Sequence, residues 1–294
     1  MDEIDIRISF ELFFNGRMPY RELADKMGMS SIAVHKRVAN LMDIGIIRGF
    51  RASPSVAAVG GVLVAVSGTG TFDDVDPVID ELERDGRAYK LIRSPGGFLF
   101  VEGILRDISD LDDFTTRVIS TCGIKNPRIL IPHLPSRRSA PRIELSTTDR
   151  SIIKALSNDC RRPLNEVAGA LGISTRTVKR RLDRMIGLEA VELRAEMVPT
   201  ASGDIISFLF LYLSEDADRD LVAHRLRSEN FPRVMTTILF SNEPGLIIAN
   251  CWAGSMKATE DLKKDLSSRY PVDRIDLNVL YDMHFIKSWK DLGP

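Results

Sequence analysis

Residues 149–191, DRSIIKALSNDCRRPLNEVAGALGISTRTVKRRLDRMIGLEAV, follow the same pattern as residues 5–47, DIRISFELFFNGRMPYRELADKMGMSSIAVHKRVANLMDIGII. The two stretches align without a gap at an offset of 144 positions. Self-similarity of this kind indicates that one supersecondary unit occurs twice. We interpret the chain as a tandem duplication, on the identical pairs Asp5/Asp149, Ile8/Ile152, Leu12/Leu156, Arg17/Arg161, Pro19/Pro163, Glu22/Glu166, Ala24/Ala168, Gly28/Gly172, Ser30/Ser174, Val34/Val178 and Arg37/Arg181.

Each copy predicts three helices, because its apolar residues recur at helical spacing. The second helix is expected to end at Gly28 or Gly172, since glycine readily adopts the left-handed conformation of a C-cap. Two residues later Ser30 or Ser174 can cap the third helix. A helix, a short turn with glycine and a Ser-capped helix form a helix-turn-helix motif. A small β-hairpin, or wing, is predicted after each motif, in GIIRGFRASP (45–54) and EAVELRAEMVP (189–199).

The third helix of the second copy concentrates positive charge, although the whole chain has 40 basic and 41 acidic residues. Val178, Leu182 and Met185 form an apolar stripe toward the other helices, and most of the basic residues lie off it. A basic run on one helix is often only a solvated face, but its place in a repeated helix-turn-helix favours DNA reading in a major groove. The predicted DNA-binding residues are Ser31, Ile32, His35, Lys36, Arg37, Thr175, Arg176, Lys179, Arg180, Arg181 and Arg184.

The two reading helices differ in charge. The first carries fewer basic residues than the second, so the two copies should read different sequences or differ in affinity. Arg181 borders the apolar stripe, and we expect it and Arg37 to contact phosphates rather than bases.

Between and after these basic segments the chain is acidic, with 8 basic and 12 acidic residues in 52–132 and 11 and 14 in 201–294. Both acidic segments predict the order strand, helix, strand, strand, helix, strand, which is the ferredoxin-like pattern. Helices cover one face of such a sheet, and the other face must pair with something. Val62, Val64 and Val66, and in the other copy Phe208 and Phe210, are expected on that face. The partner is either the sheet of the other copy or a second chain.

The predicted fold class is α+β, with two winged helix-turn-helix domains alternating with two ferredoxin-like βαββαβ domains. The predicted boundaries are 1–58 and 147–201 for the winged domains, 59–134 and 202–294 for the ferredoxin-like domains, and 135–146 for a linker. An apolar content of 44% and a charged content of 28% are typical of a globular protein. No run is long enough to span a membrane, no signal peptide precedes the first helix, and three separated cysteines form no disulfide framework, so a cytoplasmic location is expected.

This arrangement resembles the Lrp/AsnC (feast/famine) family of prokaryotic transcriptional regulators. The resemblance lies in Asp5, YRELADKMGMS (20–30), VHKRVANLMDIGII (34–47) and their partners in the second copy. It implies double-stranded DNA as a partner, self-association through the ferredoxin-like (RAM-like) domains, and often a small-molecule effector. Family members that bind amino acids typically have a Gly-x-x-Asp-like turn. In the turns here, SPGGFLF (94–100) and SNEPGLII (241–248), Gly97 and Gly245 remain but the acidic residue is expected to be absent. Without that carboxylate, capture of an amino group by charge pairing is disfavoured.

No catalytic motif, cofactor motif or metal-ligand spacing is found, and no catalytic residue, cofactor or metal is predicted. Two other interpretations stay open. One is a sirohaem decarboxylase-like enzyme, which shares this fold and would use Arg93, Arg233, His224 and Trp252. The other is an architectural DNA-binding protein without an effector. The acidic clusters at 73–76 and 110–113 are interpreted as helix caps.

Overall fold

The structure is a computed structural model that describes residues 1–133 and 143–292. The chain divides into two compact units. The helical unit contains residues 1–61, 143–202 and 289–292, and the sheet unit contains residues 62–133 and 203–288. Most of the predicted linker, 135–146, lies outside the described residues.

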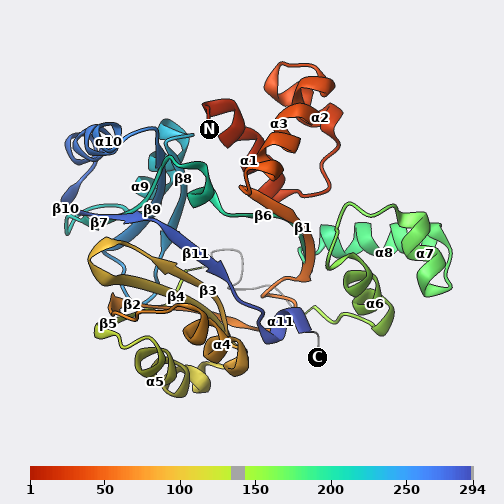
Figure 1. Cartoon of the computed structure of the whole chain (residues 1–294), viewed down its shortest axis with the longest axis horizontal. Helices are drawn as coiled ribbons and strands as arrows, with labels where there is room; N and C mark the ends of the chain where they lie inside the picture. Colours follow the sequence, from red (N-terminus) through yellow and green to blue (C-terminus); the bar gives the residue numbers. More distant parts are fainter. Residues whose placement is uncertain (134–142, 293–294) are drawn as a thin grey trace. The chain divides into compact units, whose positions relative to one another are not determined.

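The helical unit confirms the predicted helix-turn-helix motifs (Figure 1). The second helix of each group ends at a left-handed glycine, Gly28 at φ 64° and Gly172 at φ 65°. Local sequence therefore sets the sharp turn, because a residue with a Cβ rarely adopts this conformation. The helices are α1 (Glu3–Phe14), α2 (Tyr20–Met27) and α3 (Ser31–Asp43) in the first group, α6 (Thr147–Leu156), α7 (Leu164–Leu171) and α8 (Thr175–Gly187) in the second, and the short α11 (Trp289–Leu292).

The predicted wings are not hairpins. Each segment forms one strand, β1 (Ile47–Pro54) or β6 (Val191–Met197), and the two strands pair antiparallel with each other. Helix α1 packs against β6 and α6 packs against β1, so the first helix of each group contacts the strand of the other copy. We call the paired strands β1 and β6 the β1–β6 ribbon. One apolar core contains residues of both copies, including Phe50 of β1 and Leu193 of β6. The hairpin prediction is wrong because a strand's backbone groups can be satisfied by a distant strand as well as by a neighbouring one.

The sheet unit consists of two ferredoxin-like sheets, in the strand orders β5-β2-β4-β3 and β10-β7-β9-β8. The first copy contains β2 (Val62–Thr69), α4 (Asp76–Asp85), β3 (Ala88–Arg93), β4 (Phe98–Leu105), α5 (Leu111–Thr121) and β5 (Lys125–Leu130). The second contains β7 (Ile205–Leu213), α9 (Arg219–Asn230), β8 (Val234–Leu239), β9 (Leu246–Ala253), α10 (Met256–Arg269) and β10 (Val272–Leu280). Short 3-10 turns lie at Pro95–Gly97, Ile108–Asp110 and Pro199–Ser202.

A strand that the sequence did not predict, β11 (Asp282–Phe285), adds a fifth strand to the first sheet by pairing antiparallel with β3. The C-terminal end of the second copy therefore completes the sheet of the first. His284 lies in β11, where its Nε2 is 2.8 Å from Asp282 Oδ2.

The two sheets of one chain face each other through aromatic side chains. Phe100 and Phe208 have ring centroids 5.4 Å apart, and Phe98 and Phe210 have centroids 5.7 Å apart. Phe208 and Phe210 thus lie where they were expected. Val62, Val64 and Val66 do not, because they pack with Phe114 in the core under α4 and α5. The strand VLVAV is apolar on both faces, so its sequence could not show which face meets the helices.

Candidate nucleic-acid interface

Helices α3 and α8 are built alike from their first residue. Ser30 Oγ accepts a hydrogen bond from the Ala33 amide at 3.2 Å, and Ser174 Oγ accepts one from the Thr177 amide at 3.1 Å. These caps satisfy amide groups that the helix itself leaves unpaired, and they fix the first turn of each helix. The inward residues are fully or almost fully buried in both copies: Val34, Val38 and Leu41 in α3, and Val178, Leu182 and Met185 in α8.

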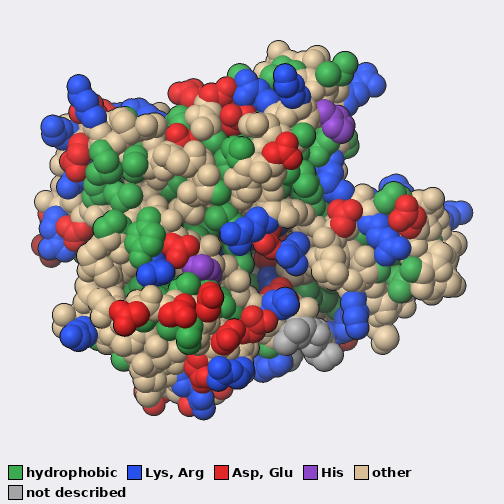
Figure 2. Space-filling view, viewed as in Figure 1, with side chains coloured by type: hydrophobic (Ala, Val, Ile, Leu, Met, Phe, Trp, Pro, Cys, Tyr) green, Lys and Arg blue, Asp and Glu red, His purple; other side chains and the backbone are tan. Residues whose placement is uncertain are grey.

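The outward faces of the two helices differ chemically. Most of the predicted base-reading side chains are exposed, namely Ile32, His35 and Lys36 on α3 and Thr175, Arg176, Lys179, Arg180 and Arg184 on α8, whereas Ser31 is half-buried. Figure 2 shows Lys and Arg side chains at the surface of both helical groups. Basic side chains at the N-terminal turns of exposed helices can contact phosphates and base edges of duplex DNA.

Arg37 and Arg181 point into the domain instead of outward. Arg37 Nη1 donates to Asp5 at 2.7 Å and to Asp2 at 2.8 Å, and these bonds raise the pKa of the guanidinium. Arg181 Nη1 donates to Asp149 at 3.1 Å and to Ser146 at 3.0 Å. The structure therefore gives both arginines partners on the first helix of their own group, where the sequence suggested phosphate contacts. Their geometry suits positioning of the reading helix.

Asp149 is the most enclosed member of these ion pairs, with no exposed surface. Burial by itself raises the pKa of this carboxyl, but hydrogen bonds from Ser146 and Arg181 outweigh it, and the net pKa is lowered. Asp149 thus stays charged and holds α6 to α8. Arg184 Nη1 lies 3.6 Å from the same carboxylate, while its side chain remains more than half exposed.

Two of the reading residues have partners of their own. Lys179 Nζ forms an ion pair with Asp183 one turn later, at 2.8 Å. The His35 ring meets the ring of Tyr20 edge-on, with centroids 4.3 Å apart. Arg161 of the other copy lies over the same tyrosine, at 4.2 Å from the ring centroid. Tyr20, the first residue of α2, is therefore contacted both by His35 of its own copy and by Arg161 of the second copy.

A reciprocal pair of arginines joins the two helical groups, and sequence reasoning did not assign it a role. Arg161 Nη1 and Nη2 donate to the carbonyls of Gly16 at 2.8 Å and Met18 at 3.1 Å. Arg17 Nη1 donates to the carbonyls of Arg162, at 3.0 Å, and of Cys160. The two are an identical pair in the repeat, which was the available signal. We call these contacts the arginine clasp.

Gly16 lies inside this junction. A Cβ at this position would stand 2.9 Å from the backbone of Arg194 and 3.0 Å from Cys160 Sγ. The Gly16 amide also donates to the Leu193 carbonyl at 2.7 Å. Only glycine permits these two segments of the chain to approach this closely.

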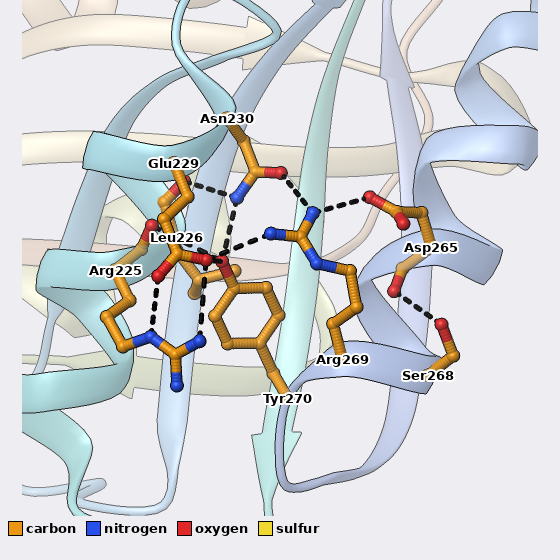
Figure 3. Close-up of polar contacts among 8 residues, drawn as sticks. All are labelled: Arg225, Leu226, Glu229, Asn230, Asp265, Ser268, Arg269 and Tyr270. Atoms are coloured by element: carbon orange, nitrogen blue, oxygen red, sulfur yellow. Dashed lines mark hydrogen bonds and ion pairs between the residues drawn. The ribbon is translucent and has the colours of Figure 1, made fainter.

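The sheet unit holds a polar network between α9 and α10 (Figure 3). Tyr270 Oη receives a hydrogen bond from Asn230 Nδ2 and donates to Glu229, both at 2.9 Å. Arg269 Nη1 and Nη2 reach Asn230 at 3.1 Å and Glu229 at 2.9 Å. Arg225 pairs with the same glutamate at 2.6 Å. The polar groups satisfy one another, so this network ties two helices together and presents no ligand site.

The turn between β8 and β9, where no acidic residue was expected, contains one carboxylate, that of Glu243. It accepts a hydrogen bond from Arg128 Nε at 2.6 Å, and Arg128 Nη1 donates to Tyr212 Oη at 2.8 Å. The hydrogen bond to Glu243 raises the pKa of Arg128. This carboxylate is therefore already engaged between the two sheets.

The four residues of the enzyme interpretation are not gathered in one place. Cys251 packs in the core under the helices, so Trp252, the next residue of β9, faces the opposite side of the sheet. His224 lies exposed on α9, which belongs to the helix layer. Arg93 belongs to the other sheet and pairs with Asp282 at 3.2 Å. Arg233 is exposed.

The acidic clusters also have local partners. Asp74 accepts a hydrogen bond from the Asp76 amide at 3.0 Å near the start of α4, and Asp107 and Asp110 form a capping box before α5. Asp113 pairs instead with Arg87 at 2.7 Å. In the part of the chain that the structure describes, no three His, Cys, Asp or Glu side chains are arranged to hold a metal ion. Within residues 1–133 and 143–292, no helix is both long and apolar enough to cross a membrane.

Fold and surface together define a class: a duplicated chain with two helix-turn-helix heads and two RAM-like sheets. Residues 145–186 match the AsnC-type helix-turn-helix domain, and residues 1–48 match a winged helix-turn-helix DNA-binding domain. The chain is 32% identical over 121 residues to the HTH-type transcriptional regulator LrpA of Pyrococcus horikoshii, covering 40% of this chain and 86% of LrpA. It is 31% identical over 121 residues to the HTH-type transcriptional regulator Ptr1 of Methanocaldococcus jannaschii, covering 40% of this chain and 82% of Ptr1. The chain belongs to the Lrp/AsnC family.

Among solved structures, the siroheme decarboxylase NirDL has the same fold over almost the whole chain. The TM-score is 0.62, with 98% of this chain and 94% of NirDL covered, at 15% sequence identity. At this identity the similarity concerns the fold alone.

Proposed function

We propose that this protein is a sequence-specific DNA-binding transcriptional regulator, whose helices α3 and α8 each enter a major groove. The observation that carries the proposal is the pair of identically capped helices whose outward faces are exposed and carry basic side chains, among them Lys36 on α3 and Arg176 and Arg180 on α8. The similarity to regulators of two archaea supports it. In this proposal the chain is not an enzyme, because His224 lies in the helix layer and Arg93 in the other sheet, away from the neighbouring pair Arg233 and Trp252.

The sheet unit has an assembly role in the proposal. One chain already pairs its own two sheets, so it supplies the equivalent of a family dimer without a second copy. Further self-association would use other surfaces. The proposal does not require an effector, and the engaged state of Glu243 argues against that turn as an amine-binding site.

Arg180 is exposed on the outward face of α8. Arg180→Ala should weaken binding to a selected DNA site by about 1–3 kcal/mol and should relax preference at part of that site. Fluorescence anisotropy on the selected duplex and on a scrambled one, over a salt series, measures both effects. For the intact protein the affinity should fall steeply with salt, because phosphate neutralisation releases counterions.

Lys264→Ala, an exposed change on α10, is the matched control and should leave both measurements unchanged. If the intact protein bound both duplexes weakly and without salt dependence, the regulator proposal would be wrong. If the intact protein bound the selected duplex specifically and Arg180→Ala changed neither its affinity nor its site preference, α8 would not read DNA.

The arginine clasp joins the two heads to each other within the helical unit. Arg17→Ala combined with Arg161→Ala should loosen that geometry. Inserting about five base pairs between the two half-sites turns one of them to the opposite side of the duplex, since a helical turn is about 10–10.5 base pairs. We expect this insertion to weaken DNA binding by the intact protein about tenfold or more, and DNA binding by the double variant clearly less.

The measurement is the ratio of each protein's affinity for the selected site to its affinity for the lengthened site. Circular dichroism should show unchanged helix content in the double variant. An unchanged ratio, with the helices intact, would show that the β1–β6 ribbon alone sets the spacing of the heads.

A further inference from the structure

We propose that the two heads read chemically different half-sites: the first recognises a thymine methyl group through Ile32, and the second recognises a guanine through Arg176. This inference rests on the proposed function and specifies which bases the DNA must offer.

Ile32 and Arg176 occupy the same structural position. Each is the second residue of its reading helix, α3 from Ser31 and α8 from Thr175. The caps before them and the buried stripes behind them match in the two copies. Any difference in what the two heads contact at this point therefore comes from the side chain and not from the backbone.

Ile32 is the most exposed of the large apolar side chains in the described residues, at 83%. An exposed isoleucine is not unusual by itself. Its place is informative, because at the N-terminal turn of a reading helix a side chain reaches base edges. Only one base presents an apolar group in the major groove, namely thymine with its 5-methyl group. The branched aliphatic side chain of Ile32 is complementary to that methyl and offers nothing to a phosphate.

Arg176 offers the opposite chemistry. It is exposed, and no hydrogen bond or ion pair engages its guanidinium within residues 1–133 and 143–292. The nearby Lys179, in contrast, is paired with Asp183. A free guanidinium presents a planar fork of donors, and guanine is the base that accepts two parallel bonds in the major groove, at O6 and N7.

The surrounding residues strengthen the contrast. Where α8 carries Lys179, Arg180 and Arg184, α3 carries His35, Lys36 and Asn40. The second head should therefore bind its half-site more tightly and with the steeper dependence on salt. The expected operator is asymmetric, with a thymine-containing half and a guanine-containing half.

The probe is obtained by selecting duplexes from a random-sequence library with the full-length protein. In the selected duplex, deoxyuridine then replaces each thymine in turn, which removes only the methyl group. Separately, 7-deazaguanine replaces each guanine, which removes only the N7 acceptor. Removing the contacted methyl should weaken binding about fourfold, as expected for loss of one buried methyl-sized group. Loss of one of the two guanine acceptors should weaken binding about tenfold.

Variants assign each effect to a side chain. With Ile32→Ala the deoxyuridine effect should disappear while the 7-deazaguanine effect remains, and with Arg176→Ala the reverse should hold. Ile32→Arg should select a guanine in place of the thymine. Both positions, Ile32 and Arg176, are exposed, so all three variants should fold, and their thermal unfolding serves as a check.

Two negative results are distinguishable. If no sequence is enriched from the library, the proposed function fails and this inference fails with it. If a site is enriched but its affinity ignores both base analogues, or Ile32→Ala retains the deoxyuridine effect, the regulator proposal stands and the assignment of bases is wrong.

Discussion

Phe100→Ala should lower the free energy of unfolding by about 3–5 kcal/mol, the cost of removing a large aromatic side chain from a packed interior. Phe100 is 1% exposed and faces Phe208, which is 3% exposed, across the two sheets. The change leaves a cavity at the contact that pairs the sheets. Urea denaturation of the full-length chain, followed by circular dichroism, measures the effect.

Phe285→Ala is the matched control, because Phe285 lies on β11 of the same unit and is 37% exposed. It should cost well under half as much, since partly exposed positions lose little on truncation. Phe208→Ala, alone and combined with Phe100→Ala, completes a double-mutant cycle, in which an aromatic pair contributes about 0.5–1.5 kcal/mol of coupling. Equal costs for Phe100→Ala and Phe285→Ala would contradict the face-to-face packing of the sheets.

Asp149→Ala should destabilise the helical unit by about 3 kcal/mol, because it leaves Arg181 half-buried without its carboxylate. The equivalent change in the first copy is a built-in comparison. Asp5 is 13% exposed at its side chain and shares Arg37 with Asp2, so Asp5→Ala should cost about 1 kcal/mol. Chemical denaturation of both variants, in parallel with the unchanged protein, tests the order of the two effects.

Asp149→Ala should also change how stability depends on pH. The pKa of Asp149 is lower in the folded than in the unfolded protein, so its contribution is fully present above the unfolded value of about 3.9. That contribution is lost as the pH falls through the folded pKa. The difference between the unchanged protein and Asp149→Ala should therefore be constant near neutral pH and shrink in acid below about pH 4. A difference that grew on acidification would contradict the charged, hydrogen-bonded state of this carboxylate.

Much of the candidate interface could be predicted from sequence because its determinants are local. Gly172 sets a left-handed turn, Ser174 caps the following helix, and Val178 marks the buried stripe. Each of these signals depends on residues within one or two turns of chain. The duplication multiplied the evidence, since the same signals recur in the first copy.

The side-chain partners at the margin of that interface were less accessible to sequence reasoning. Arg37 and Arg181 lie at the edge of the apolar stripe, where helical periodicity does not distinguish a phosphate contact from an internal ion pair. Their carboxylate partners, Asp5 and Asp149, are 32 residues away in the chain. Such pairing depends on how the helices pack.

The duplication, the helix-turn-helix motifs and the βαββαβ order could be predicted from the residues alone, because they follow from periodicity, caps and turns along the chain. The folded molecule was needed to learn which strands pair across the copies, as β1 with β6 and β3 with β11, and which face of VLVAV (62–66) meets the helices. It also revealed the arginine clasp. The physical reason is that a strand's hydrogen-bonding groups and an arginine's donors are the same whatever their partner, so their pairing is fixed only when distant segments pack together.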